Sequence, residues 1–241
     1  MYNDQGSVDK ALEGDYEFTI GGVLSEAWER VEGSKLRFLA AFFVYVIIGV
    51  AVSMVVSLFF GPSQFYYDQG LILKGVLNDQ AQNLLSSPIL IPLMVGMIFL
   101  GIRRAVDEEI EVKSIFDYYI HVWMLVFAAL LINILTFIGF MLLLLPGIYL
   151  ATAYMFTLPL IVEKQLGIWQ AMELSRKTVT NKWFSFFFYN VSIGLIIIIS
   201  AVPLGIGLFW TIPLAFIGYG ILYRKVFGYT PNESQSDESI M

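Results

Sequence analysis

The chain contains no cysteine, so neither a disulfide framework nor a thiolate metal site is available to it. Charged residues are also scarce: they make up 14% of the 241 residues, whereas hydrophobic residues make up 58% and the mean hydropathy is +0.73. A soluble globular domain usually has about 25% charged residues. The composition therefore excludes an ordinary soluble protein and predicts one that lies in a membrane.

Four long stretches contain no Asp, Glu, Lys or Arg. Membrane spans are expected there, because a charge at mid-bilayer costs roughly 2.5–3.5 kcal/mol. The stretches are Phe38–Tyr67, Gln80–Ile102, Val122–Val162 and Trp183–Tyr223. The last two are each about twice the roughly 20 residues that cross a bilayer, so each is expected to hold two helices. Six spans are predicted, at about 38–60, 86–105, 122–144, 147–164, 183–202 and 205–224.

Five prolines are predicted to interrupt helices, because proline lacks an N–H donor and clashes with the preceding turn. Pro146 divides the third charge-free stretch and Pro203 divides the fourth. The other three lie in similar short motifs, Leu-Ile-Pro-Leu at Pro92, Thr-Leu-Pro-Leu at Pro159 and Thr-Ile-Pro-Leu at Pro213. These motifs recur along the chain and suggest an internal repeat.

All but one of the fourteen lysines and arginines fall on one side of the six-span pattern, and only Lys74 falls on the other. Cations gather on the cytoplasmic side of membrane proteins, so both chain ends are predicted to be cytoplasmic. The ends, 1–19 and 226–241, are acidic and are predicted to be disordered tails around a six-span domain of residues 20–225. No removable signal peptide is expected.

Each predicted pair of spans follows a short segment whose apolar residues fall at helical spacing, as in an amphipathic helix at a membrane surface. These segments begin near Val23, Ser114 and Ile168. We interpret the chain as three copies of an interfacial helix followed by a membrane hairpin, although apolar hairpins also resemble one another by composition alone. The predicted fold class is an all-α membrane protein with six transmembrane helices in three hairpins, each preceded by an amphipathic interfacial helix.

Polar residues inside predicted spans are the usual pointers to function in a membrane protein. The clearest are Asn133, Asn190, Thr157 and Thr211, which would either line a pathway or hydrogen-bond between helices. No Asp, Glu, Lys or Arg lies deep in the predicted spans. No catalytic residue, metal ligand or cofactor is therefore predicted, and the protein is not expected to be an enzyme.

Two further sets of residues are predicted to mediate contacts. Gly49, Ser53, Ser57 and Gly61 recur at four-residue intervals, forming a small-residue ridge against which another helix of this chain or of a second copy can pack. Basic residues near the predicted inner headgroups are candidates for contact with anionic lipid, although topology determination alone also explains them. They are Arg30, Lys35, Arg37, Arg103, Arg104, Arg176, Lys177 and Lys182.

The stretch LPGIYLATAYMFTLPLIVEKQLGIWQAMELSRKTV, which begins at Leu145, resembles a signature of prokaryotic membrane proteins. These are the YciC-like group and the membrane domains found beside some glycerophosphodiester phosphodiesterases. The matching features are Leu145-Pro146-Gly147, Pro159, Glu163, the spacing from Ala171 to Ser175, and Trp183. The resemblance implies a multi-pass inner-membrane protein of bacteria or archaea. It supplies no catalytic residue, and the chain has no phosphodiesterase domain.

These features favour a non-enzymatic integral membrane protein that interacts with membrane lipids. Another membrane protein or a second copy of the chain is a further expected partner, and nucleic acid is not. The alternative is a transporter or channel for a small or hydrophobic solute, with Asn133, Asn190, Thr157 and Thr211 along its pathway. A polar cavity that connects the two leaflets would favour this alternative.

Overall fold

The computed structural model describes residues 6–229, and within this range the chain is helical and contains no strand. The elements are α1 (Val8–Glu13), α2 (Ile20–Val31), α3 (Lys35–Phe60), α4 (Ser63–Asp68), α5 (Ile72–Ala105), the 3-10 helix η1 (Val112–His121), α6 (Val122–Leu142), α7 (Leu144–Ala153), α8 (Thr157–Glu163), α9 (Ile168–Asn181), α10 (Trp183–Ala201) and α11 (Leu208–Phe227). The prediction of an all-α protein is confirmed.

Five stretches of the described chain are long and apolar enough to cross a membrane. They are α3, α5, η1 with α6, α7 with α8, and α10. The most exposed of these are α3 and α10, in which only 11% of the most apolar window is buried. A helix that is apolar all round and largely exposed is typical of one surrounded by lipid. The protein is therefore membrane-embedded, whereas six spans in three hairpins remain a prediction.

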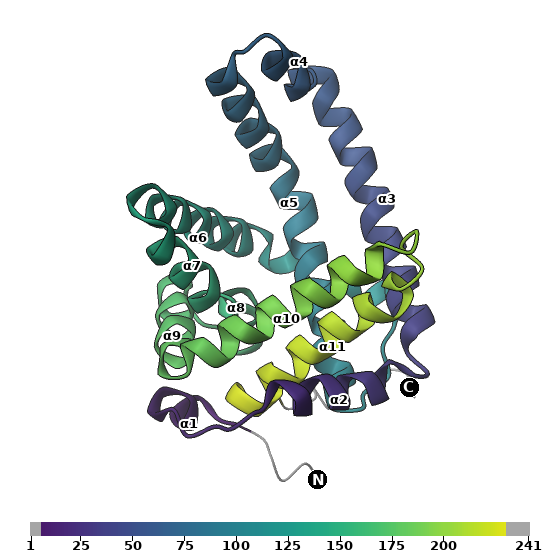
Figure 1. Ribbon diagram of the computed structural model, residues 1–241, viewed down its shortest axis with the longest axis vertical. Helices are drawn as coiled ribbons and strands as arrows, with labels where there is room; N and C mark the ends of the chain where they lie inside the picture. The colour runs from purple at the N-terminus through teal and green to yellow at the C-terminus, as the bar shows by residue number, and fades with distance from the viewer. Residues whose placement is uncertain (1–5, 230–241) are drawn as a thin grey trace.

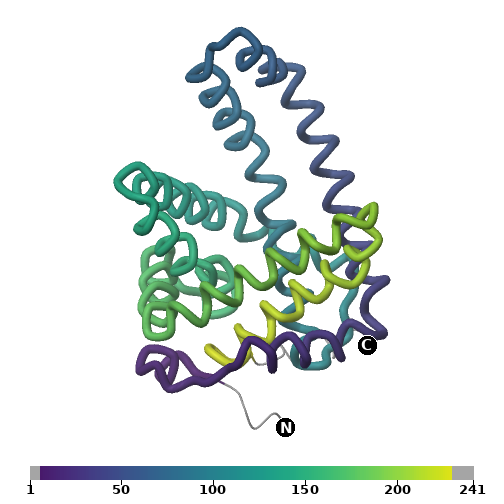
Figure 2. Tube along the Cα trace, viewed as in Figure 1, coloured from purple at the N-terminus to yellow at the C-terminus, as the bar shows by residue number. Residues whose placement is uncertain are grey.

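α3 and α5 lie side by side along the long axis of the molecule and project beyond the other helices, with α4 at their far end (Figure 1). The remaining helices gather around the opposite half, and α2 lies across the end of the molecule. α10 and α11 run side by side at a steep angle to α3 and α5 (Figure 2). The molecule thus has a slender projecting part and a broad body at one end.

α11 is the central helix of this body. It packs against α2, α3, α5 and α10, and most of its twenty residues are buried. Gly101 of α5 and Gly220 of α11 meet backbone to backbone, because a methyl group on Gly220 would overlap the carbonyl of Gly101. Small residues allow membrane helices to approach this closely. α11 carries Arg224 and Lys225 in its last turn and is not among the five candidate spans.

Two predicted span boundaries require correction. Residues 72–85, which lie between the predicted spans at 38–60 and 86–105, extend α5 by several turns. The predicted span at 147–164 is divided into α7 and α8 by a turn at 154–156. The first difference arises because polar residues on one face of α5 lower the mean hydropathy without preventing helix formation.

The prolines predicted to break helices have three different roles. Pro203 lies between α10 and α11, as predicted. Pro146 and Pro159 are each the third residue of a helix, where an N–H has no intrahelical partner, so they lie just after the interruptions. Pro92 and Pro213 lie inside α5 and α11, so the breaks predicted there are wrong. Neighbouring helices and side chains can satisfy the carbonyls that such prolines leave free.

The N-terminal residues 6–19 are folded, which corrects the predicted disordered tail. α1 contacts α9 and α11, Ala11 is fully buried, and the Tyr16 hydroxyl donates to the carbonyl of Thr178 over 2.6 Å. At the other end, residues 226–229 are buried against the body, which also corrects the start of the predicted C-terminal tail. The rest of the two predicted tails, 1–5 and 230–241, lies outside the described residues.

The three segments predicted to be amphipathic are all helical, as α2, η1 and α9. α2 directs Val23, Ala27 and Val31 into the body and leaves Trp28 exposed. An exposed tryptophan on such a helix suits the headgroup region of a bilayer. The three-unit repeat and the interfacial position of these helices stay predictions.

The contact between α5 and α11 can be tested with Gly220→Ala. The added methyl group would overlap the backbone of α5, so we expect the free energy of unfolding to fall by about 1–3 kcal/mol. Gly194→Ala in α10 is the matched control, because that position faces open space and alanine favours a helix by about 1 kcal/mol. Thermal unfolding in detergent, followed by circular dichroism, measures both. Equal melting temperatures for the two variants would contradict the contact.

Candidate functional site: a polar groove between α5 and α6

A groove of about 380 Å³ lies between α5 and α6. Its polar lining comes from Gln80, Asn83, Ser86 and Ser87 of α5 and Asn133 of α6, and none of its lining residues is charged. The apolar lining consists of Leu84, Leu90, Ile91, Val126, Ala129 and Leu130. Clefts of roughly 300–1,000 Å³ commonly hold small ligands.

The spacing of the polar residues along α5 brings them to one face. Gln80, Asn83 and Ser87 are three and four residues apart, and residues at these spacings are neighbours on a helix surface. η1 holds the start of α6 against α5, since the Tyr119 hydroxyl donates to the carbonyl of Ile89 over 2.7 Å. Beyond this point α6 diverges from α5 (Figure 1), and the polar face of α5 is left open.

A proline next to the groove explains part of its polarity. Pro88 has no N–H to donate to the carbonyl of Leu84, and the Ser87 hydroxyl donates to that carbonyl instead, over 2.7 Å. The Asn133 amide nitrogen donates to the carbonyl of Ala129 over 2.8 Å. Each side chain keeps further hydrogen-bonding capacity, because a hydroxyl has two lone pairs and an amide has a second N–H and a carbonyl oxygen. The groove can therefore offer neutral donors and acceptors to a ligand.

The other three polar residues predicted in the membrane do not line this groove. The Asn190 amide lies 3.8 Å from the Met155 sulfur. Thr157 is fully buried, and its hydroxyl has no hydrogen-bond partner among the described residues. The Thr211 hydroxyl donates to the carbonyl of Gly207 over 3.3 Å. The structure thus does not gather the four predicted residues into one site.

The small-residue ridge of α3 faces α5 only in part. Gly49 lies opposite Leu90, where an added methyl group would be at an ordinary contact distance of 3.8 Å. Ser53 is exposed and Ser57 is half-buried. Gly61 ends α3 with φ +70°, a conformation that favours glycine, so it serves the turn into α4. Both predicted uses of the ridge, within the chain and with a second copy, stay open.

A cluster of charges joins α2, α5 and α11 at the broad end of the molecule. Arg224 is only 2% exposed; its guanidinium lies 2.7 Å from the carboxylate of Glu26 and also donates to the carbonyl of Ala105. Glu26 pairs with Arg30 at 2.8 Å, and Arg30 lies 3.4 Å from Asp107. These bonds hold α2 against the two central helices. Sequence reasoning counted Arg224 among the cations on the cytoplasmic side and did not identify it as buried.

The basic residues predicted to contact anionic lipid form two groups. They are Arg30, Lys35, Arg37, Arg103 and Arg104, near the start of α3 and the end of α5, and Arg176, Lys177 and Lys182, on or just after α9. Arg37 lies 3.7 Å from Glu109. Arg176 binds both carboxylate oxygens of Glu173, at 2.8 and 3.0 Å, and holds the pKa of that carboxyl below its usual range. Lys182 donates to the carbonyl of Tyr16. A lipid phosphate would compete with these partners, and lipid contact at these residues stays a prediction.

Comparison with known proteins identifies no relative: no family model, curated protein or solved structure matches the chain. The resemblance to the YciC-like group therefore depends on the sequence motifs alone.

The ion pair that holds α2 can be tested with Glu26→Ala, which leaves Arg224 buried without this carboxylate. Removing one partner of a buried pair costs about 3–5 kcal/mol. Because the Glu26 side chain is 22% exposed, we expect an effect at or below the lower end of that range. Glu29→Ala, an exposed position of the same helix, is the control and should leave stability unchanged. Thermal unfolding and limited proteolysis between α1 and α2 give the comparison, and identical behaviour of the two variants would refute the role of the pair.

Proposed function

We propose that the chain is a non-enzymatic integral membrane protein that binds membrane lipid in the groove between α5 and α6. The observation that carries this proposal is a cluster of five neutral polar side chains between helices that are otherwise apolar and exposed. A polar site that opens beside apolar helix surfaces matches an amphiphile, because its head and its chains need different surroundings. Exposed side chains such as Leu84 and Leu130 supply the apolar flank.

The chemistry of the lining narrows the ligand to the uncharged part of a lipid. Amides and hydroxyls exchange neutral hydrogen bonds with glycerol, ester or hydroxylated head groups. A phosphate is normally held by Arg or Lys, and neither lines the groove. A volume of about 380 Å³ fits a head group with its glycerol, while the acyl chains lie outside along α5 and α6.

The proposed location is the cell (inner) membrane, with both chain ends in the cytoplasm. The distribution of the fourteen cations supports this orientation. The backbone N–H of Gly6 donates to the carbonyl of Arg224 over 3.1 Å, so the first and last described segments lie at the same end of the molecule. The resemblance to prokaryotic inner-membrane proteins points the same way. Membrane lipid is the proposed partner, with a second copy or another membrane protein as the alternative.

A transporter or channel is the weaker alternative. It requires Asn133, Asn190, Thr157 and Thr211 along one pathway, whereas only Asn133 lines the groove. The polar groove residues of α5 come from the half of the helix that is remote from Arg103 and Arg104, so the polar part of the groove lies toward one face of the molecule.

Asn133→Leu tests the proposed lipid site. The variant loses one hydrogen-bonding side chain, worth about 0.5–1.5 kcal/mol, so we expect retained lipid to fall about 2- to 10-fold in native mass spectrometry. Asn190→Leu is the control, because this asparagine lies outside the groove, and it should retain lipid like the unmodified protein. Equal retention by both variants would exclude the groove as the site. If the unmodified protein carries neither lipid nor a partner in several mild detergents, the proposed function fails.

A further inference from the structure

The connections between α3 and α5, between α6 and α7, and between α10 and α11 differ sharply in polarity. The connection between α3 and α5 is polar, and it is fixed by hydrogen bonds from Tyr67 to Asp79, over 2.6 Å, and from Asn78 to the carbonyl of Gly61. The connections between α6 and α7 (residues 140–146) and between α10 and α11 (201–208) contain no polar side chain. Their tips are nevertheless exposed, with Leu145 77% and Leu204 95% accessible. Loops in water rarely have this composition.

The position of the α6–α7 connection follows from the contacts of Tyr149 in α7. Its hydroxyl lies 2.7 Å from the Thr180 hydroxyl of α9, and its carbonyl accepts from the Trp183 indole over 3.4 Å. α9 carries the ion-paired Glu173 and Arg176, so it lies at a polar surface. Five residues separate Tyr149 from the start of α7, which is roughly 8 Å of helix. The connection therefore cannot reach the far side of a hydrocarbon core of about 30 Å.

The α10–α11 connection is held near the same surface. The Lys35 ammonium at the start of α3 lies 5.8 Å from the ring centre of Trp210, which follows this connection in α11. At its other end, α11 carries Arg224, paired with Glu26 of α2. Both ends of α11 thus lie beside charged residues of α2 or of the start of α3. α11 packs against α2 and rises obliquely from it toward the start of α3 (Figure 2).

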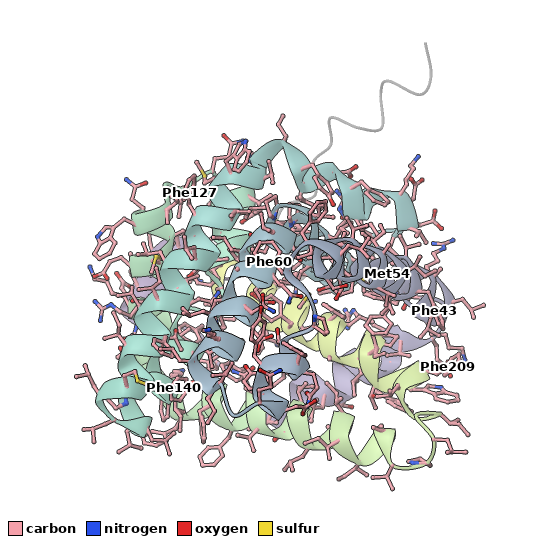
Figure 3. The ribbon with its side chains drawn as sticks, turned by 90° about the horizontal axis from the view of Figure 1, so that it is seen from above. Phe43, Met54, Phe60, Phe127, Phe140 and Phe209 are labelled. Carbon is pink, nitrogen blue, oxygen red and sulfur yellow. The ribbon has the colours of Figure 1, made fainter. Side chains whose placement is uncertain are left out.

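The view along the long axis agrees with this arrangement. Figure 3 looks down the long axis and shows α6 extended across the view between Phe127 and Phe140. α6 therefore lies across the long axis of the molecule. In the same view Phe209 of α11 lies near Phe43 of α3, and Figure 1 places the α10–α11 connection beside the lower part of α3. Neither connection reaches the end of the molecule that carries α4.

The α3–α5 pair has the opposite character. α3 has 26 residues and α5 has 34, which correspond to about 39 and 51 Å of helix. Charged residues stand at both ends of the pair, Lys35 and Arg37 at one end and Asp68 and Lys74 at the other. Both helices are therefore long enough to carry polar groups into the water on each side of a bilayer.

We propose that only α3 and α5 cross the membrane, whereas the α6–α7 and α10–α11 pairs enter it from the inner side and return without crossing, with their apolar tips among the acyl chains. The surface formed by residues 140–146 and 201–208 is thus a binding surface for acyl chains. The proposal replaces the six-span prediction and does not depend on the lipid groove. Both chain ends stay on the inner side in either arrangement, so the location of the termini cannot distinguish them.

Single cysteines test the proposal directly, because the chain has none of its own. Leu145→Cys and Leu204→Cys place a thiol at the two apolar tips, and Gln69→Cys places one between α4 and α5. In intact cells a membrane-impermeant maleimide should label Gln69→Cys and spare the other two, which should react only after the membrane is dissolved. Leu145 and Leu204 are exposed in the structure, so these substitutions should not disturb folding.

Depth is measured on the same variants. Nitroxide labels at residues 145 and 204 in reconstituted vesicles should collide readily with oxygen and poorly with a water-soluble nickel complex, as expected inside a hydrocarbon core of about 30 Å. External labelling of Leu145→Cys or Leu204→Cys would show full crossing and overturn the proposal. Ready labelling from the inner aqueous side, or high nickel accessibility, would place the tips in water and overturn it as well.

Discussion

The close contact between α5 and α11 is the constraint on which the rest of the structure depends. Glycines at 101 and 220 bring the two backbones together, and this approach leaves α11 enclosed by α2, α3, α5 and α10. The same contact brings Arg224 to the end of α5, where its guanidinium reaches the carbonyl of Ala105 and the carboxylate of Glu26. A buried arginine is tolerated there because acceptors surround it. α2 is fixed to the body as a result.

The groove forms because α5 and α6 pack against different neighbours and diverge. α5 continues as one helix past the body, and the Ser87 hydroxyl satisfies the Leu84 carbonyl that Pro88 leaves without an N–H donor. α6 is joined to it near its own start, through Tyr119 of η1, and then diverges from it and packs against α7. The polar face of α5 is left without a helix to cover it. An uncovered polar face inside an otherwise apolar region calls for a ligand or water to satisfy it.

The membrane class and five of the long apolar stretches could be predicted from sequence, because the absence of charge over a span is a local property. The full length of α5 could not be predicted from hydropathy, since Gln80 and Asn83 interrupt the apolar run. Their three-residue spacing, continued by Ser87, was the signal that would have revealed a polar helix face. Pro92 and Pro213 were misjudged because a proline motif does not show whether neighbouring helices will stabilise the turn around it. The depth of the α6–α7 connection in the membrane depends on the contact between Tyr149 and Thr180. These residues belong to different helices, so no local sequence pattern predicts that they meet.

The central position of α11 has a consequence for how the protein is made. Among the described helices α11 is the last to leave the ribosome, yet it is the one against which α2, α3, α5 and α10 pack. Until α11 is synthesised, the surfaces of those helices that it will cover face lipid, water or another protein. Assembly of the body is therefore a post-insertion event, and a chain that stops before residue 208 would keep its apolar helices but lack the element that joins them.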